Sequence, residues 1–460
     1  MTIELQFLGA ARHVTGTKHL LHVNEKQLLL DCGMVQGPRE MSNHANRNLP
    51  LDARKVTAVV LSHAHIDHSG SLPRLVKDGY AGPIWCTDAT KDLVAILLKD
   101  SANIAAQDAR HLGKRGHAFV PPYDMADVEK TISQLRSVPY HKRVRVLPEV
   151  EVEFFDAGHI LGAAMVLLDV DDGTSMRRVA FTGDHGRKNL PILKDPERLP
   201  DCDVLITEST YGNKLHVERA ELEEELARVV LEEQRDGGRI IVPAFSVGRT
   251  QNVVMYLGNL MAAGKIPRLS IYVDSPLSRE ATKIMSRHPE CFDADTQKVL
   301  ASGRSPFFFD GVRYVSDVEE SKSLNDLRTG VIIAASGMCE SGRVLHHLKY
   351  SVGRSEDCVL LVGFQAEGTL GRRLQEGQTD VRIYGEWYKV HCKVREMGGL
   401  SAHADYGELL AHTGHLAPKC KQAFVVHGEE ATALIYADRL RKAGFRTVEV
   451  PKQRDRFVVA

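Results

Sequence analysis

The chain has 460 residues, more than one hydrophobic core usually holds, so we expect two domains. Its 43% hydrophobic and 26% charged residues are typical of a globular protein. The formal net charge of −1 excludes binding of nucleic acid through bulk positive charge and leaves only a local basic surface. No apolar run reaches the roughly 20 residues of a transmembrane helix, the N-terminus lacks a signal-peptide pattern, and the eight cysteines form no C-x-x-C pair. We therefore predict a cytoplasmic location, reduced thiols and no membrane partner.

The first half of the chain is predicted to contain both strands and helices. Short antiparallel strands are expected at residues 3–10, 17–23 and 26–33, and a buried strand at 55–65. Helices are expected at residues 69–79, 88–106 and 124–138, the last from the helical spacing of Val128, Ile132, Leu135 and Val138. Three further strands, each ending at a polar residue, are expected at residues 150–159, 177–186 and 202–212.

The pattern changes after about residue 211. A charged helix at residues 218–238 leads into continuous apolar strands that alternate with helices, at residues 239–245, 269–275, 330–337 and 358–364. This alternation predicts a parallel sheet covered on both faces. From about residue 394 the chain returns to a loop, helix, strand and helix. We therefore predict an α/β protein with one domain at residues 1–210, an inserted domain at 211–395, and a segment at 396–460 that completes the first domain.

A cluster of titratable residues follows the strand that begins at residue 55. The stretch "VVLSHAHIDHSG" places His63, His65, Asp67 and His68 within six positions. Alternate residues of an extended segment share a face, so His63 and His65 can hold one metal, while Asp67 and His68 beyond the bend can reach a second. Other strand ends, each next to a glycine, must supply the remaining ligands. The candidates are His159, Asp184 and His427.

The nitrogen-rich set of ligands favours zinc, although manganese and iron stay open. Two metals about 3.5–4 Å apart would bridge a water molecule and lower its pKa, so that hydroxide forms at neutral pH. Metal-bound imidazoles also need hydrogen-bond partners that orient them. Asp31, at the end of the strand "LLLDCG", is the predicted partner.

These motifs resemble a known family. "SHAHIDHSG", together with Asp31, His159, Asp184 and a late histidine, resembles the metallo-β-lactamase fold, a four-layer αβ/βα sandwich with two metals at one edge. "ITESTYG", a long insert, "GGLSAHADYGELL" and "FVVHGEE" resemble the β-CASP nucleases. This family includes the cleavage subunit of the eukaryotic pre-mRNA 3′-end processing factor and its bacterial and archaeal relatives. The stretches "AASGMCESGRVLHHLK" and "VGFQAEGTLGRRL" are similar to the inserted domain of the family.

The resemblance implies a zinc-dependent ribonuclease that takes part in RNA processing. His63, His65 and His159 would hold one metal, Asp67, His68 and His427 the other, and Asp184 would bridge them. A two-metal-activated hydroxide would hydrolyse RNA phosphodiesters and leave a 5′-phosphate and a 3′-hydroxyl. The resemblance adds Glu208 and His403 to the catalytic group of Asp67 and Asp184. His403 would protonate the leaving oxygen and Glu208 would keep that imidazole protonated, although without the resemblance His403 would more readily be interpreted as a polar residue at a helix N-terminus.

Substrate contacts are expected in the inserted domain, where "FSVGRTQ", "SGMCESGR" and "EGTLGRR" place hydroxyls, glycines and arginines near helix starts. With an aromatic content of only 6%, binding should depend on phosphates more than on base stacking. The predicted phosphate contacts are Ser246, Arg249, Ser336, Arg343, Thr369, Arg372 and Arg373.

Several functions stay open at this point. A cleft between two domains should be too narrow for duplex RNA, so single-stranded RNA is the predicted substrate. An endonuclease is favoured because the chain ends 33 residues after His427, without the C-terminal dimerisation domain common among exonucleolytic relatives. A 5′-to-3′ exoribonuclease, a small-molecule metallo-hydrolase, a DNA-directed nuclease and a non-catalytic RNA-binding scaffold are the alternatives. The sequence leaves a homodimer open and does not identify the protein partners or the physiological RNA.

Overall fold

The computed structural model describes residues 3–37, 39–113, 119–171, 173, 175–217 and 219–459. The chain forms two compact units. Unit 1 comprises Met1–Lys188, Asp195–Leu215 and His403–Ala460, and unit 2 comprises Asn189–Lys194 and His216–Ala402. The domain limits predicted from the sequence, at residues 210 and 395, stay a prediction.

Unit 1 contains two seven-stranded sheets. Strands of the first sheet lie in the order β22 (Arg456–Val458), β1 (Ile3–Gly9), β2 (Lys18–Val23), β3 (Lys26–Leu30), β4 (Val56–Val60), β5 (Ile84–Cys86) and β6 (Leu135–Ser137). Strands of the second sheet lie in the order β21 (Val448–Glu449), β20 (Gln422–Val425), β11 (Val204–Thr207), β10 (Met176–Phe181), β9 (Ala164–Asp171), β8 (Val150–Asp156) and β7 (Val144–Leu147). As predicted, β1, β2 and β3 pair antiparallel.

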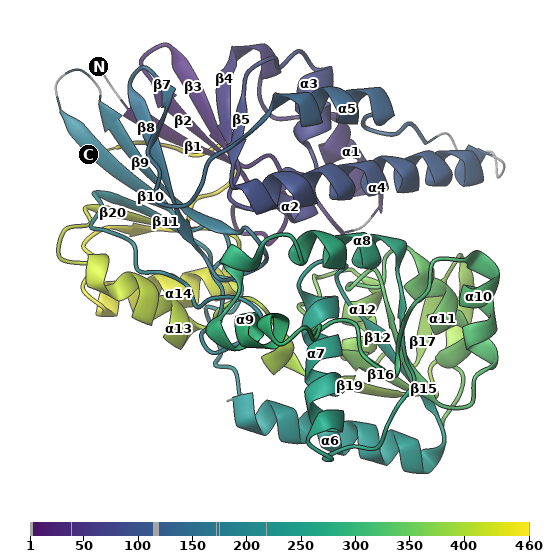
Figure 1. Ribbon diagram of the computed structural model, residues 1–460. Coiled ribbons are helices and arrows are strands. Elements are labelled where there is room, and N and C mark those ends of the chain that lie inside the picture. Colours follow the sequence, from purple (N-terminus) through teal and green to yellow (C-terminus); the bar gives the residue numbers. More distant parts are fainter. Residues whose placement is uncertain are drawn as a thin grey trace. The chain divides into compact units, whose positions relative to one another are not determined.

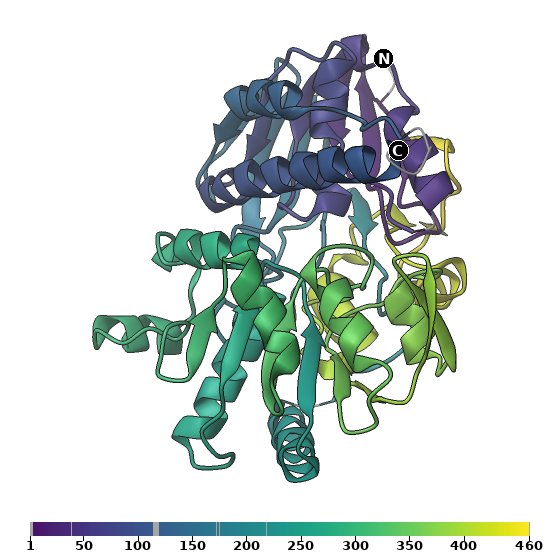
Figure 2. The same cartoon turned by 90° about the vertical axis from the view of Figure 1, so that its right-hand side faces the viewer.

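One hydrophobic core joins the two sheets of unit 1. It takes alternate side chains from strands of both sheets, such as Leu28 and Leu30 of β3 and Val166 and Leu168 of β9. The helices on the first sheet are α1 (Arg39–Arg47), α2 (Ile66–Ser69), α3 (Leu72–Lys77), α4 (Asp88–Gly113) and α5 (Met125–Gln134), and those on the second are α13 (Tyr406–Thr413) and α14 (Glu430–Lys442). Figure 2 shows the long α4 lying next to α5 over the first sheet. The arrangement confirms the predicted four-layer sandwich.

One predicted helix is too long. The helix expected at residues 124–138 ends at Gln134, and Leu135–Ser137 form strand β6, which pairs in parallel with β5. Asp124 starts the helix as a capping box, and the helical spacing of Val128 and Ile132 is correct. Leu135 continued that spacing by coincidence, because pairing with an adjacent strand overrides a local periodicity.

Unit 2 contains a six-stranded parallel sheet, in the order β14 (Val312–Tyr314), β13 (Ile271–Asp274), β15 (Gly330–Ala334), β12 (Arg239–Pro243), β16 (Cys358–Leu361) and β19 (Lys393–Glu396). Two separate cores take alternate residues of the same strands, for example Ile240 and Ile241 of β12. The helices are α6 (Arg219–Asp236), α7 (Arg249–Ala262), α8 (Pro276–Met285), α9 (Ala294–Ala301), α10 (Val318–Ser323), α11 (Arg343–Ser351) and α12 (Leu370–Gln375). The parallel sheet with both faces buried is therefore confirmed.

A hairpin of β17 (Asp380–Ile383) and β18 (Glu386–Lys389) stands apart from this sheet. Within the described ranges, no helix combines the length and hydrophobicity needed to cross a membrane.

Candidate metal centre and active site

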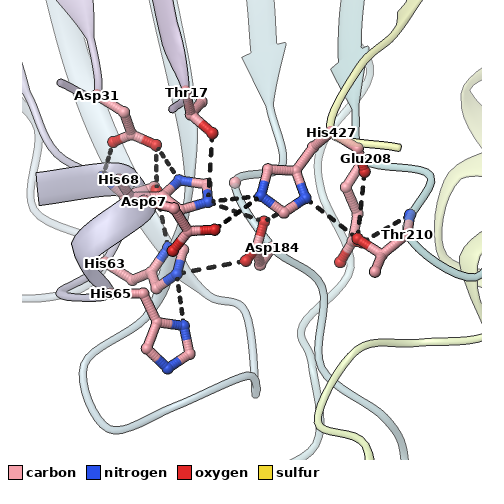
Figure 3. Close-up of polar contacts among 12 residues, drawn as sticks. Thr17, Asp31, His63, His65, Asp67, His68, Asp184, Glu208, Thr210 and His427 are labelled. Carbon is pink, nitrogen blue, oxygen red and sulfur yellow. Dashed lines mark hydrogen bonds and ion pairs between the residues drawn. The ribbon is translucent and has the colours of Figure 1, made fainter. Parts of the chain in front are cut away.

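The first group of site residues surrounds one point at an edge of unit 1 (Figure 3). His63 and His65 follow β4, His159 follows β8 and Asp184 follows β10. The Nδ1 atom of His65 lies 3.1 Å from His63 Nε2 and 3.2 Å from His159 Nε2. Asp184 Oδ2 lies 3.4 Å from His63 Nε2 and 3.6 Å from His159 Nε2. Three imidazole nitrogens and one carboxylate oxygen therefore converge, all within 4.8 Å of one another.

The second group lies on the other side of Asp184. Asp67 and His68 belong to the short helix α2, and His427 follows β20. The Nε2 atoms of His68 and His427 are 3.0 Å apart, and His427 Nε2 lies 3.4 Å from Asp67 Oδ2. Asp184 Oδ1 is 3.2 Å from His68 Nε2. The two oxygens of one carboxylate thus face two different groups of side chains.

The strand topology explains why residues so far apart in sequence meet. Strands β10, β11 and β20 are neighbours and run in parallel, so the residues that follow them emerge at the same edge of the second sheet. Asp184, Glu208 and His427 are those residues. His427 has a φ of +49°, and its N–H donates to the carbonyl of Ala10 at 2.8 Å, which turns its side chain back toward the cluster.

The donor set fits divalent metals. A neutral imidazole has one donor and one acceptor nitrogen, so the nitrogens that converge at 3.0–3.2 Å cannot all satisfy one another by hydrogen bonds. A cation at the shared point removes that conflict. Burial lowers the pKa of His65 to about 3, and nearby His63 adds to the effect. Burial, followed by the charge of His403, lowers the pKa of His159. Both rings are therefore neutral, which is the form that ligates a metal.

Asp31 lies behind the second group of residues. Its carboxylate accepts the N–H and the hydroxyl of Ser62, both at 2.7 Å, and lies 2.6 Å from His68 Nδ1. Since His68 Nδ1–H donates to this carboxylate, Nε2 is the nitrogen that faces Asp184 and His427. Asp31 is fully buried and has a φ of +58°.

Three hydroxyl residues beside the imidazoles escaped the sequence analysis. Ser62 Oγ is 3.0 Å from His63 Nδ1. Thr210 Oγ1 is 3.1 Å from His427 Nδ1, and Thr17 Oγ1 is 3.4 Å from His68 Nε2 (Figure 3). The sequence could have indicated two of these residues by their position, because Ser62 precedes the first histidine of the motif and Thr210 follows Glu208 by two positions.

Glu208 holds His403 from the end of β11. His403 Nδ1 lies 3.2 and 3.3 Å from the two Glu208 oxygens. The same oxygens accept backbone N–H groups, from His185 at 2.6 Å and from Thr210 at 3.2 Å. Burial alone would lower the pKa of His403, but the charges of Glu208 and Asp184 outweigh it and raise the pKa above its ordinary value. The imidazole is therefore stabilised in its protonated form.

The loop that carries His403 is attached to its surroundings by backbone contacts. His403 pairs with Gly186 in an antiparallel bridge, and Asp405 pairs with Tyr211 in a parallel one. The N–H of Ala404 donates to the carbonyl of His185 at 2.9 Å. These contacts join three loops of unit 1 that surround Asp184.

The seven predicted phosphate residues all lie in unit 2, in the loops that follow β12, β15 and β16 or in the first turns of the helices α7, α11 and α12 after those loops. These strands are adjacent and parallel, so the loops meet at one edge of the sheet. Several of the side chains have internal partners. Arg343 pairs with Asp274 at 2.5 Å, and Arg372 with Glu376 at 2.8 Å. The hydroxyl of Ser336 accepts the N–H of Glu340 at 3.0 Å.

The remaining phosphate candidates are partly engaged as well. Thr369 caps α12 by accepting the N–H of Arg372, Arg373 Nη1 contacts the carbonyl of Gly368 at 3.4 Å, and Ser246 Oγ lies 3.3 Å from Ser275 Oγ. Arg249 is the first residue of α7 and is largely buried. A phosphate-binding role for these residues stays a prediction, and binding there would require several of the arginines to exchange partners.

Comparison with known proteins decides the family. Three family models match the chain: the metallo-β-lactamase superfamily at residues 19–244, the β-CASP domain at 250–374, and the Zn-dependent metallo-hydrolase RNA specificity domain at 387–451. The protein named ribonuclease TTHA0252 from Thermus thermophilus is 34% identical, over 95% of both chains. The chain belongs to the β-CASP family of the metallo-β-lactamase superfamily. The resemblance inferred from its motifs is thereby confirmed.

A second relative is named for a different role. The transcription termination factor FttA of Methanosarcina mazei is 31% identical, over 96% of this chain and 69% of that protein. Among solved structures, a protein of unknown function from Enterococcus faecalis matches with a TM-score of 0.55 and 15% identity, covering all of both chains. At that identity the likeness supports the fold alone.

Proposed function

We propose that this β-CASP protein is a metal-dependent endoribonuclease that hydrolyses single-stranded RNA and leaves a 5′-phosphate and a 3′-hydroxyl. The observation that carries the proposal is the placement of Asp184 between two groups of imidazoles, with His403 and Glu208 beside it. A ribonuclease as a relative over nearly the whole chain supports RNA as the substrate.

Under this proposal, His63, His65 and His159 would hold one divalent metal and Asp67, His68 and His427 the other, and Asp184 would contribute to both sites. Zinc suits this set because imidazole nitrogens dominate it. When bound, such metals supply Lewis-acid charge at the scissile phosphate and lower the pKa of water. Asp31, Ser62 and Thr210 keep the imidazoles oriented through the hydrogen bonds described above.

His403 supplies the proton for the leaving 3′-oxygen. Its Nδ1 is bonded to Glu208, so the proton on Nε2 is the one available to the substrate. Glu208 is itself fixed by two backbone N–H groups, and it can therefore orient the ring and stabilise its positive charge without moving. General-acid assistance of this kind contributes about 10²–10⁴-fold to a rate.

A 5′-to-3′ exoribonuclease is the second candidate. The loops after β12, β15 and β16 lie at one edge of the sheet, and the helices that follow them begin with several arginines, which would suit a terminal phosphate as well as an internal one. A small-molecule metallo-hydrolase is less consistent with the matched RNA specificity domain.

The test uses one single-stranded RNA, labelled separately at its two ends, with bound metal measured in the same protein sample. Internal fragments from both labels, absent with the Asp184→Ala variant, are expected for an endonuclease. Mononucleotides released only from the 5′ label would favour the exonuclease. Equal rates on duplex and single-stranded RNA would contradict the single-strand preference, and no cleavage by metal-loaded protein would reject the nuclease proposal.

A further inference from the structure

The β17–β18 hairpin of unit 2 has a regular geometry. Its strands pair antiparallel and are joined by the two-residue turn Tyr384–Gly385, where both residues have positive φ, +52° and +88°. Two positive φ values match the twist of a tight hairpin. Arg382 Nε donates to the carbonyl of Gly385 at 2.9 Å and fixes the arginine beside the turn.

One face of this hairpin is largely buried, with Glu386 exposed at its end and paired with Lys349, and the other face is open. Val381 and Ile383 belong to a hydrophobic core of unit 2, and Tyr388 packs against that core. Alternation along the strands turns the neighbouring residues outward, and all of them are exposed. Trp387, opposite Arg382 in the register, has an exposed fraction of 70%, the largest among the exposed large hydrophobic residues in the described part of the chain. Burial does not explain a tryptophan at this position, because most of its ring contributes nothing to the core.

The charges around Trp387 indicate what it binds. Four strand residues face outward: Arg382, Lys389, Trp387 and Asp380, which lies opposite Lys389. Two cations and one anion give this face a net positive charge. The partner should therefore combine a flat ring with negative charge. The matched RNA specificity domain begins at residue 387.

We propose that the hairpin face formed by Arg382, Trp387 and Lys389 binds single-stranded RNA outside the metal centre. An unpaired base stacks on the Trp387 indole, and Arg382 and Lys389 contact the adjoining phosphates. RNA as the ligand rests on the proposed function. A second protein chain is the less favoured occupant, because one exposed ring between charged residues is a small apolar patch.

Fluorescence can isolate Trp387, since the chain contains only two tryptophans and the other, Trp85, is partly buried against the core of unit 1. The Trp85→Phe variant is titrated with a short single-stranded RNA in the Asp184→Ala background, so that the RNA stays intact. Stacking is expected to quench the indole emission. The same RNA as a duplex, and a backbone of equal length without bases, should bind without that quenching because neither offers an unstacked base.

Affinity measurements provide the second readout. Trp387→Ala should raise the Kd for single-stranded RNA roughly 5- to 100-fold, and Trp387→Phe should recover most of the loss. Phe308→Ala, which removes another exposed aromatic ring of unit 2, is the matched control and should leave the Kd unchanged. Replacing Arg382 and Lys389 by Gln should reduce the slope of log K against log salt by about 1.4, or about 0.7 for each cation.

The outcomes separate this inference from the proposed function. RNA that is bound and cleaved without quenching, and with an unchanged Kd for Trp387→Ala, overturns the hairpin site alone. Quenching without any cleavage by metal-loaded wild-type protein supports the site and rejects the nuclease. A wild-type dimer that Trp387→Ala converts to a monomer would assign this face to a second copy of the chain and overturn the inference.

Discussion

Replacing Glu208 by glutamine tests the catalytic assignment without changing the shape of the side chain. Glu208 is fully buried, and each of its oxygens accepts one backbone N–H while both lie near His403 Nδ1. Glutamine has one acceptor oxygen and one NH₂ group. It can therefore accept from either His185 or Thr210, and the other N–H then faces a second donor.

The effect of Glu208→Gln on catalysis follows from the loss of these contacts. A hydrogen bond to a charged group is worth about 1.5–3 kcal/mol, and a buried donor left without an acceptor costs about 1–3 kcal/mol. Glu208→Gln removes both the negative charge beside His403 and one backbone acceptor. Without that charge the pKa of His403 falls, because burial is then opposed by Asp184 without Glu208, and less of the imidazole is in the protonated form that can act as an acid. We expect kcat to fall about 10²–10⁴-fold, the usual contribution of a general acid.

The assay measures kcat on single-stranded RNA and, on the same samples, metal per chain by mass spectrometry. Metal content should stay at the wild-type level, because Glu208 bonds to backbone and to His403. Glu129→Gln, an exposed glutamate on α5, is the matched control and should change neither quantity. Loss of metal from Glu208→Gln would make Glu208 a ligand, since its oxygens also lie near Asp184 and His427. An unchanged kcat with full metal would refute the role of the Glu208–His403 pair.

Three further predictions concern other parts of unit 1. His427→Ala should lose both metal and cleavage, whereas His403→Ala should lose cleavage but keep its metal; equal metal content in the two variants would contradict the assignment. Burial lowers the pKa of His19 to about 3 against an ordinary value near 6.5, so the unfolded chain binds a proton that the folded chain refuses as pH falls below 6.5. In urea unfolding, the free energy of unfolding of His19→Leu minus that of wild type should therefore be about 2 kcal/mol larger at pH 5 than at pH 8. An equal difference at the two pH values would refute this. Cys202 and Cys420, whose thiols hydrogen-bond where β11 and β20 begin side by side, should be the pair that the thiol oxidant diamide converts to a disulfide; peptide mapping that finds both reduced would disprove it.

The parts of the site that sequence predicted are those that depend on strand direction. The spacing of His63, His65, Asp67 and His68 is local, and it indicated a metal cluster before any fold was known. His159, Asp184 and His427 were predicted to join this cluster because each follows an apolar strand and precedes or follows a glycine, and the structure places them beside it. Parallel strands bring such residues to one edge, so residues hundreds of positions apart could be placed in one group. The family resemblance then added Glu208 and His403, which spacing alone did not select.

The parts that sequence could not predict depend on side-chain direction across the fold. Ser and Thr are frequent beside strands, and only the tertiary structure distinguishes Thr210, which contacts an imidazole, from one that caps a helix, as Thr369 does. Arginines in glycine-rich loops indicated phosphate binding, but Arg343 pairs with Asp274, which lies 69 positions earlier and ends β13.

Trp387 is a residue whose exposure the sequence analysis did not predict. A low aromatic content argued against base stacking, yet a single ring can provide it when it lies on the face of a strand that is left exposed. Composition averages over the whole chain, whereas a binding surface depends on which few side chains one strand presents to solvent. The hairpin register, with Arg382 opposite Trp387 and Lys389 two residues further, is therefore the observation that composition could not supply. If the fluorescence of Trp387 responds to unpaired bases, RNA binding by this protein will combine phosphate contacts with stacking.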